Sequence, residues 1–304
     1  MEHRRIGSLE VSVIGLGCNN FGWRLDAGAT AAVVHSALDA GIDFFDTAEL
    51  YGEGLSEEYL GRALHGRRQS VVIATKFGYK TAPSHRRGQP DNVRRAADAS
   101  LRRLGTDYID LFQLHSPDPS VPLADTLGAL DELVQQGKVR EVGCSNFSAT
   151  QLEEAAHAVK PGAARFVSVQ NEYSLMHREP EADVLQECER LGIAFIPYYP
   201  LSSGLLTGKY RRGRPLPKGT RLADGSGLLS DENLAVVEEL IQFAESKGHT
   251  LLELAIGWLL AHPAVASVIA GATKPEQARG NASAIAWRLS ADERAAVDAL
   301  AVYS

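Results

Sequence analysis

The sequence predicts an α/β protein that folds as a (β/α)8 TIM barrel with a short N-terminal hairpin across the barrel bottom. Three observations predict this fold: apolar runs alternate with helix-like segments, several runs carry almost no polar residue, and there are eight of them. Such alternation is typical of βαβ units and a parallel sheet, and uniformly apolar strands suit a sheet that is buried on both faces. The 304 residues suffice for one such barrel, which typically takes about 250. We therefore expect residues 1–304 to form a single domain.

The eight strand candidates follow one another along the chain. They fall at residues 11–18, 42–46, 71–76, 108–115, 139–146, 166–171, 193–199 and 266–272. An open doubly wound sheet is the alternative, and it would want a GxGxxG turn after an early strand. GLGCNNFG after the first strand has the wrong glycine spacing, so the closed barrel is preferred. The preceding RRIGSLEVSV predicts the hairpin.

Capping residues predict where the helices begin and end. Thr30 is expected to be an N-cap, and Gly41 follows the last turn of the same helix. The remaining helices are marked by Pro90 with Gly105, Pro122 with Gly137, Ser148, Pro180 with Gly192, and Pro275. Residues 202–227 are rich in Gly, Pro, Arg and Lys and predict a long loop, and loops of that length are usually functional.

Composition excludes several classes of protein. The formal net charge of −7 argues against nucleic acid as the main partner, since phosphate neutralisation needs a basic face. No apolar run approaches 18 residues, and residues 251–260 are too short to span a bilayer. Cys18, Cys144 and Cys188 are too widely spaced for a disulfide framework or a zinc site. Because the N-terminus also lacks a signal-peptide pattern, we expect a cytoplasmic protein with reduced thiols, monomeric or weakly oligomeric.

Four reactive side chains fall at or just after the ends of three neighbouring strands. Asp46, Lys76 and His115 end the second, third and fourth strands, and Tyr51 follows five residues after Asp46. Taken alone, each has an ordinary explanation: a helix cap, a surface charge, a structural histidine and a packing tyrosine. In α/β barrels, however, the carboxyl ends of the strands form the active site. The convergence of all four groups on that face predicts a catalytic site.

The sequences around these residues resemble the aldo-keto reductase family. GIDFFDTAELYG, VVIATKFG, YIDLFQLH and GCSNFS occur in the family's order, and the resemblance extends from about Arg5 to Asn281. It implies an NADPH-dependent reductase of aldehydes and ketones. It also implies Tyr51 as proton donor, with Lys76, Asp46 and His115 as its partners; all four positions match the family's pattern.

The chemistry of carbonyl reduction gives these residues the same roles. No side chain donates a hydride, so a cofactor must supply it. A phenol has a pKa near 10, and a nearby ammonium such as Lys76 lowers that pKa by favouring phenolate. Asp46 would hold Lys76 by ion pairing. His115 would donate a hydrogen bond to the carbonyl oxygen and orient the substrate.

Polar residues at the next strand ends predict a nicotinamide site. Ser145, Asn146 and Gln170 offer the hydroxyl and amide groups that a carboxamide needs. Capping of the following helices is an equal alternative for Ser145 and Asn146. Tyr198 ends the seventh strand, where its ring could stack on a flat heterocycle. The resemblance implies these same contacts.

Two later segments predict the rest of an NADPH site. YPLSSGLLTGKY resembles the family's pyrophosphate-binding loop, with Tyr199 in place of the usual serine. Pro275 starts a helix whose N-terminus favours anions, and Lys274 beside it suits the 2′-phosphate, although an ordinary surface lysine is the alternative. The remaining expected cofactor contacts are Cys18, Asn19, Asp46, Tyr199, Pro200, Leu201, Ser203, Gly204, Lys209, Gly271, Thr273, Gln277 and Asn281.

Other functions and contacts stay open at this point. Trp23 either lines the substrate pocket, with Tyr51 and His115, or packs against its own loop. An NADP(H)-binding regulatory subunit with little turnover is the alternative function, since fold alone does not decide activity. A metal-dependent hydrolase using Asp46 and His115 leaves Tyr51 and Lys76 unexplained, and we expect no metal ligand set.

Overall fold

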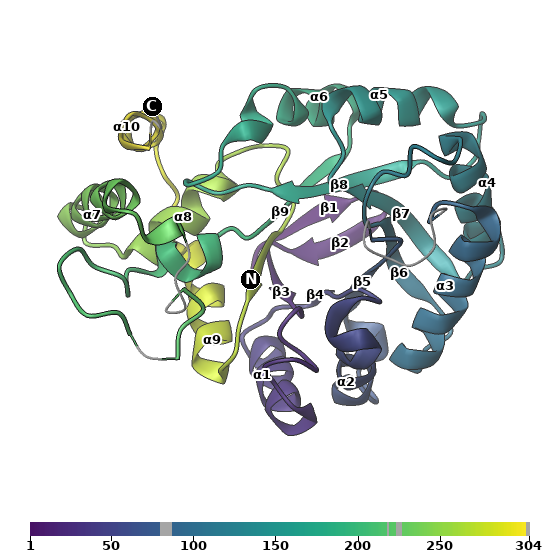
Figure 1. The fold of residues 1–304 in the computed structure, drawn as a ribbon, viewed down its shortest axis with the longest axis horizontal. Helices are drawn as coiled ribbons and strands as arrows, with labels where there is room; N and C mark the ends of the chain where they lie inside the picture. Colours follow the sequence, from purple (N-terminus) through teal and green to yellow (C-terminus); the bar gives the residue numbers. More distant parts are fainter. Residues whose placement is uncertain (80–86, 218, 223–226, 302–304) are drawn as a thin grey trace.

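The computed structural model describes residues 1–79, 87–217, 219–222 and 227–301. Within these ranges eight parallel strands lie in the order β10-β3-β4-β5-β6-β7-β8-β9, and helices surround them (Figure 1). The strands are β3 (Ile14–Gly17), β4 (Phe44–Asp46), β5 (Val72–Phe77), β6 (Ile109–Leu114), β7 (Val139–Ser145), β8 (Phe166–Glu172), β9 (Ala194–Tyr198) and β10 (Val268–Gly271). The ends of this order meet just before β10, where Phe195 N donates to Ala264 O at 2.7 Å and Ala266 N donates to Phe195 O at 2.9 Å. The predicted barrel is confirmed.

The helices follow the strands around the barrel. They are α1 (Ala27–Asp39), α2 (Leu55–Ala63), α3 (Pro90–Leu104), α4 (Leu123–Gln135), α5 (Ala149–Ala158), α6 (Val184–Leu191), α7 (Asp231–Ser246), α8 (Leu251–Leu260), α9 (Pro275–Ser283) and α10 (Ala291–Leu300). α7 precedes α8 in the connection from β9 to β10, and α10 follows α9. α7 and α10 lie together on one side of the barrel (Figure 1). The long loop expected at 202–227 contains the 3-10 helix η4 (Ser202–Thr207), and its positions 218 and 223–226 lie outside the described residues.

The N-terminal hairpin covers the barrel bottom as predicted. β1 (His3–Ile6) pairs antiparallel with β2 (Leu9–Ser12), and Ile6 and Leu9 are buried against Phe44, Leu111 and Ile196 from inside the barrel. The single strand predicted at 11–18 was wrong. Its first residues belong to the hairpin, because the chain turns at Val13 and Ser12 Oγ donates to Ile14 O at 2.7 Å.

Most predicted helix boundaries are confirmed, and two are corrected. Gly105 and Gly192 end their helices with left-handed backbone, and Ser148 forms a capping box. Thr30 is not the N-cap of α1: Asp26 is, since its carboxylate accepts from Ala29 N at 2.8 Å, and Thr30 is buried one turn into the helix. Pro180 lies in the 3-10 turn η3 (Glu179–Glu181), and α6 begins only at Val184.

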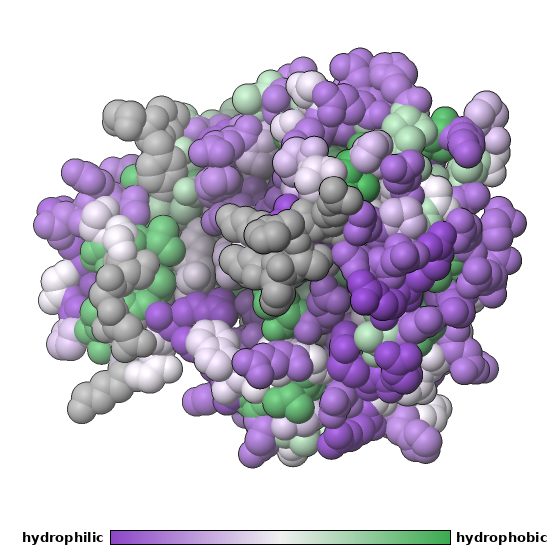
Figure 2. Space-filling model, turned by 45° about the vertical axis from the view of Figure 1, so that its right-hand side comes forward, coloured by the Kyte–Doolittle hydropathy of each residue, from purple (hydrophilic) through white to green (hydrophobic). Residues whose placement is uncertain are grey.

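The main apolar core lies between the strand ring and the helices. On the face drawn in Figure 2, hydrophilic residues cover most of the surface and hydrophobic ones form smaller separate patches. None of the helices built from described residues has both the length and the apolar character required to span a bilayer. The arrangement leaves the carboxyl ends of the strands free to form a site.

Candidate active site

A pocket of about 920 Å³ opens at the carboxyl ends of the barrel strands. Its lining includes all the predicted site residues except Lys76 and Trp23. The predicted residues that line it are Cys18, Asn19, Asp46, Tyr51, His115, Ser145, Asn146, Gln170, Tyr198, Tyr199, Pro200, Leu201, Ser203, Gly204, Lys209, Gly271, Thr273, Lys274, Gln277 and Asn281. The structure thus brings residues from the first to the last barrel strand into one cavity.

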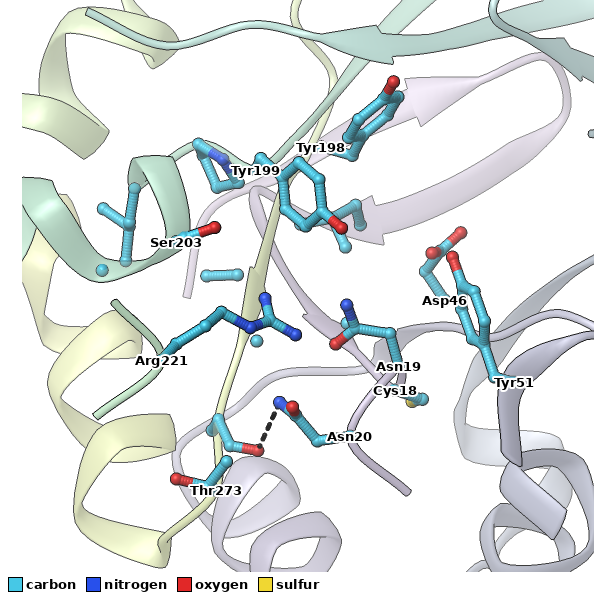
Figure 3. Close-up of a pocket in the computed structure, with 18 of the residues that line it drawn as sticks. Cys18, Asn19, Asn20, Asp46, Tyr51, Tyr198, Tyr199, Ser203, Arg221 and Thr273 are labelled. Carbon is cyan, nitrogen blue, oxygen red and sulfur yellow. Dashed lines mark hydrogen bonds between the residues drawn. The ribbon is translucent and has the colours of Figure 1, made fainter. Parts of the chain in front are cut away.

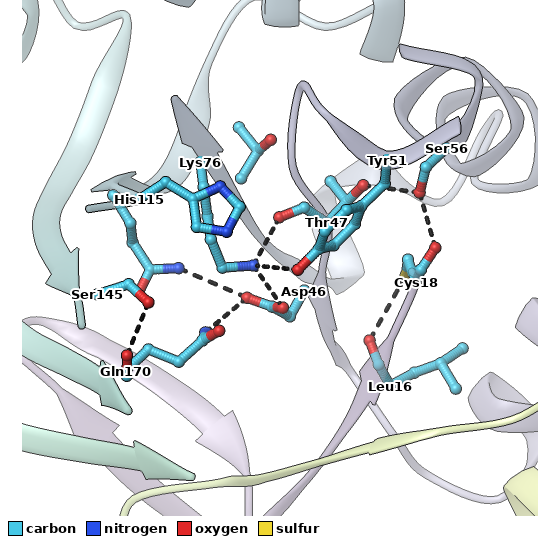
Figure 4. Close-up of polar contacts among 12 residues, drawn as sticks. Leu16, Cys18, Asp46, Thr47, Tyr51, Ser56, Lys76, His115, Ser145 and Gln170 are labelled. Atoms are coloured by element: carbon cyan, nitrogen blue, oxygen red, sulfur yellow. Dashed lines mark hydrogen bonds and ion pairs between the residues drawn. The ribbon is translucent and has the colours of Figure 1, made fainter. Parts of the chain in front are cut away.

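Lys76 lies behind the pocket wall and connects two residues that form it. Its ammonium donates to Asp46 Oδ2 at 2.7 Å, to Thr47 O at 2.9 Å and to the Tyr51 hydroxyl at 3.5 Å (Figure 4). Gln170 Nε2 donates to the other oxygen, Asp46 Oδ1, at 2.8 Å. Asp46 ends β4 and Lys76 lies in β5, so pairing of these two strands sets the geometry.

Burial and charge act in opposite directions on this group. Although burial by itself lowers the pKa of Lys76, Asp46 and Tyr51 together outweigh it, and the pKa stands above its ordinary value. Burial raises the pKa of Tyr51, while Lys76 acts against that rise. The Lys76 ammonium alone was expected to lower the phenol pKa, but burial reverses the net direction. Tyr51 is therefore held protonated beside a charged lysine.

His115 faces Tyr51 across the pocket. The two ring centroids are 6.1 Å apart and the rings are nearly perpendicular. Burial, together with the nearby Lys76 charge, lowers the pKa of His115 to about 3, so its imidazole is neutral. The buried Nδ1 makes no hydrogen bond within the described residues. A neutral ring can donate one N–H to a ligand atom between His115 and Tyr51.

A cluster of amides and hydroxyls extends from the tetrad. Asn146 donates from Nδ2 to His115 O at 2.9 Å and accepts from the Tyr198 hydroxyl at 2.8 Å. Ser145 Oγ donates to Gln170 O at 2.7 Å. The capping alternative does not describe Ser145 and Asn146, because α5 is capped by Ser148. These groups are instead directed into the pocket wall.

The far end of the pocket is formed by irregular backbone and cations. Tyr199, Ser203 and Gly204 have positive φ angles of 49°, 57° and 96°. A Cβ on Gly204 would lie 2.8 Å from Lys209 Nζ, so glycine leaves the room that this ammonium occupies. Figure 3 shows Asp46 and Tyr51 at one end of the pocket and Ser203, Arg221 and Thr273 at the other. Anions are the ligands that such a cationic end favours.

The start of α9 adds a helix N-terminus to this end. Lys274 is the N-cap residue, and its side chain makes no cap hydrogen bond. Thr273 N donates to Gln277 Oε1 at 2.7 Å, which fixes the turn into the helix. No carboxylate among the described residues pairs with Lys209 or Lys274. Both ammonium groups are therefore available to a ligand.

Several lining residues were missed in the sequence. They are Gly17, Asn20, Arg24, Leu50, Tyr79, Ser116, Pro117, Thr207, Gly219, Thr220, Arg221, Ile269, Ala270 and Ala272. Asn20 and Ser116 directly follow predicted residues, and Arg221 belongs to the basic loop already expected to be functional, so a wider window would have found them. Trp23 does not line the pocket: its side chain is 64% exposed and the Arg24 guanidinium lies over it at 4.7 Å.

No group of three or more His, Cys, Asp or Glu side chains suited to a metal ion occurs in the described part of the chain. Of the two donors considered for a metal ion, the Asp46 carboxylate is paired with Lys76, and the His115 imidazole lies beside the Tyr51 ring.

Comparisons with known proteins agree over the whole chain. The sequence model described as "Aldo/keto reductase family" matches residues 13–302. The chain is 38% identical to aldo-keto reductase str7 of Strobilurus tenacellus over 322 aligned residues, which cover 98% of this chain and 91% of that protein. A glycerol dehydrogenase from Gluconobacter oxydans, AKR11B4, matches its structure with a TM-score of 0.85 at 31% identity, covering 98% of this chain and 94% of that one. The holo form of aldo-keto reductase AKR11C1 from Bacillus halodurans has a TM-score of 0.82 at 33% identity, with coverage of 99% and 96%.

Proposed function

This chain belongs to the aldo/keto reductase family, and we propose that it reduces aldehydes and ketones to alcohols with NADPH, using Tyr51 as the general acid. One observation carries the proposal: the protonated Tyr51 hydroxyl, at the wall of a large pocket, lies 3.5 Å from the charged ammonium of Lys76. A general acid must be protonated before transfer and stabilised as a base afterwards. Burial provides the first condition and Lys76 the second.

Four side chains divide the work at the substrate carbonyl. Neutral His115 donates an N–H to the carbonyl oxygen and orients it toward Tyr51. The Tyr51 hydroxyl gives its proton to that oxygen. Lys76 stabilises the resulting phenolate, and Asp46 keeps Lys76 charged and in position at 2.7 Å. When bound, the reduced nicotinamide supplies the hydride that no side chain can.

The residues of the pocket fit such a dinucleotide. Near Tyr51, Ser145, Asn146 and Gln170 offer donors and acceptors to a carboxamide. The buried Asn20 Oδ1 lines the pocket and has no hydrogen-bond partner within the described residues. Tyr198, which contacts Asn146, would stack on the nicotinamide ring. At the other end of the pocket, Ser203, Gly204 and Lys209 would hold the pyrophosphate.

Preference for NADPH over NADH rests on Lys274. Its ammonium is unpaired among the described residues and stands at the N-terminus of α9, where the helix dipole adds to its positive charge. Both features favour a 2′-phosphate. We also propose a cytoplasmic protein, because the three cysteines are free and buried, as in a reducing compartment. A monomer or weak oligomer stays a prediction.

The same residues can run the reaction in reverse, with Tyr51 as the base. One structural neighbour is a glycerol dehydrogenase, so hydroxylated aldehydes and polyols belong among the substrates to be tested.

The test is a screen for NADPH oxidation over aldehydes, ketones and quinones, with NADPH binding followed in parallel by quenching of protein fluorescence. We expect turnover of several carbonyl compounds and none in Tyr51→Phe. Tight NADPH binding without turnover of any compound would overturn the proposal and favour an NADP(H)-binding regulatory subunit.

A further inference from the structure

We propose that Glu57 is a positioning residue for catalysis, which holds the loop of Tyr51 against the strand of Lys76. This inference rests on the proposed function, because it concerns the proton donor of that reaction. Glu57 lies in the first turn of α2, six residues after Tyr51, and does not line the pocket. Its side chain is fully buried.

The Glu57 carboxylate joins three elements. Its Oε1 accepts from Thr75 Oγ1 at 2.6 Å, and Thr75 is the neighbour of Lys76 in β5. Its Oε2 accepts from Arg103 Nε at 2.6 Å, and Arg103 lies in the last turn of α3. Both oxygens are thus engaged, one by the strand of Lys76 and one by a neighbouring helix.

Arg103 also contacts the Tyr51 loop directly. Gly54 ends the 3-10 helix η1 (Tyr51–Gly54), which begins at the proton donor. A Cβ at Gly54 would lie 2.8 Å from Arg103 Cδ, and the φ of Gly54 is 95°, so glycine is required on both counts. The Arg103 stem therefore packs on the end of the segment that carries Tyr51, while its guanidinium holds Glu57.

Two further hydrogen bonds, made by Ser56, hold the same loop together and attach it to the segment after β3. The Thr47 and Ser56 hydroxyls are 2.8 Å apart, and Ser56 Oγ donates to Cys18 O at 2.9 Å (Figure 4). Thr47 O also accepts from Lys76. The loop from Thr47 to Glu57 is therefore fixed to β5 at both ends. Thr47 contacts Lys76 at one end, and Glu57 contacts Thr75 at the other.

The place of Glu57, rather than its buried charge, points to a role in catalysis, because Asp110 is equally buried at the other end of the barrel. Burying an ion pair is often no more stabilising than apolar packing of the same volume. Glu57, however, contacts the residue next to Lys76, where catalysis requires precise geometry. The contact between Tyr51 and Lys76 is long, at 3.5 Å, so a small outward shift of the loop would separate them. Glu57 sets this separation through Thr75 and Arg103.

The experiment compares Glu57→Gln with Asp110→Asn. Asp110 is an equally buried carboxylate that pairs with Arg68 and Arg140 but lies at the other end of the barrel, so its variant reports lost stability alone. Steady-state kinetics with NADPH and a carbonyl substrate would be run over a range of pH, at a temperature where both variants are folded by circular dichroism.

We expect Glu57→Gln to lower kcat by about tenfold or more, because small displacements of a catalytic group are costly. The NADPH dissociation constant should stay within about twofold, and the basic limb of the kcat profile should move to higher pH, because Lys76 then stabilises the Tyr51 phenolate less. Arg103→Lys, which keeps the charge, should retain most of the activity. Asp110→Asn should keep both kcat and the pH profile.

Equal kcat and an unchanged basic limb in Glu57→Gln and Asp110→Asn would overturn the inference while leaving the proposed function intact. Absence of turnover in the unsubstituted protein would remove both. If Glu57→Gln does not fold, Thr75→Val takes its place, since it removes only the hydroxyl that holds Glu57. A wild-type kcat and pH profile in that variant would equally contradict the positioning role.

Discussion

The two ends of the barrel each contain a buried carboxylate paired with a cation, and they use it differently. At the amino end, Asp110 forms ion pairs with Arg68 at 2.6 Å and Arg140 at 2.9 Å, and it accepts a hydrogen bond from Ile73 N at 2.9 Å. At the carboxyl end, Asp46 accepts from Lys76 at 2.7 Å and Gln170 at 2.8 Å. The bonds to the carboxylates are alike, so the carboxylates themselves do not distinguish a functional end from a structural one.

The difference lies in what else the cations contact. Besides Asp110, Arg68 donates to Thr106 Oγ1, Val71 O and Tyr108 O. Lys76 instead reaches a phenol at 3.5 Å, and that phenol opens onto a pocket of about 920 Å³. A phenol beside a cavity, more than a buried charge, distinguishes the carboxyl end of the barrel, where we place the proposed chemistry.

Removing the cation at the carboxyl end should have the largest effect on turnover. In Lys76→Met the Tyr51 phenolate loses its stabilising charge, and we expect kcat to fall by about 10²- to 10⁴-fold, the range of general acid catalysis. NADPH binding, measured by fluorescence quenching, should change little. A variant that keeps its turnover would show that the ammonium is as structural as Arg68.

Removing the charge at the amino end should affect stability instead. Asp110→Asn leaves the mostly buried Arg68 without a countercharge, while Arg140 is half exposed, and we expect the free energy of unfolding to fall by about 3 kcal/mol. Urea denaturation measures the loss, and kcat below the unfolding transition should match the wild type. A selective loss of kcat in the folded variant would break the contrast between the two ends.

Acid should destabilise the fold through His115. Burial first, and the Lys76 charge second, lower its pKa from 6.5 to about 3. Between these values the unfolded chain binds a proton that the folded chain does not, so stability is full above pH 6.5 and falls as the pH drops. At pH 5 the loss from this group is on the order of 2 kcal/mol. His115→Asn should therefore lose less stability than the wild type between pH 7 and 5 in urea denaturation; parallel losses would contradict this.

The smallest expected change concerns the phosphate end of the pocket. Lys274→Ala should weaken NADPH by about tenfold, the scale of one charge-assisted contact, and NADH hardly at all. Isothermal titration with both cofactors provides the comparison. An equal loss for both would mean that Lys274 does not contact the 2′-phosphate.

The sequence predicted the barrel and most of the pocket because strand ends carry their residues to one face by topology alone. Asp46, His115 and Gln170 needed only a strand assignment to be placed together. The strand at 11–18 failed because apolar runs of a hairpin and a barrel strand are continuous in sequence, and only the turn at Val13 separates them.

Other features depend on packing that no local pattern contains. Arg221 reaches the pocket from 23 positions beyond Tyr198 because its loop folds back over the site, where its guanidinium lies 5.8 Å from the Tyr199 ring. Nothing in the local sequence distinguishes Glu57 from a surface residue of α2. Its burial becomes evident only from its contacts with Thr75 and Arg103 in the structure. The direction of the Tyr51 pKa shift could not be predicted without knowing that the hydroxyl is buried, because burial reverses the lowering expected from Lys76 alone.

The proposed reaction depends on Tyr51 delivering the proton at the open end of the barrel. The most direct measurement compares Tyr51→Phe with the wild type in NADPH affinity and in turnover of the best carbonyl substrate. We expect a loss of turnover of at least about 10²-fold with NADPH affinity nearly unchanged, because only the hydroxyl that carries the proton is removed. Preserved turnover with weakened NADPH binding would contradict it and make Tyr51 a cofactor contact.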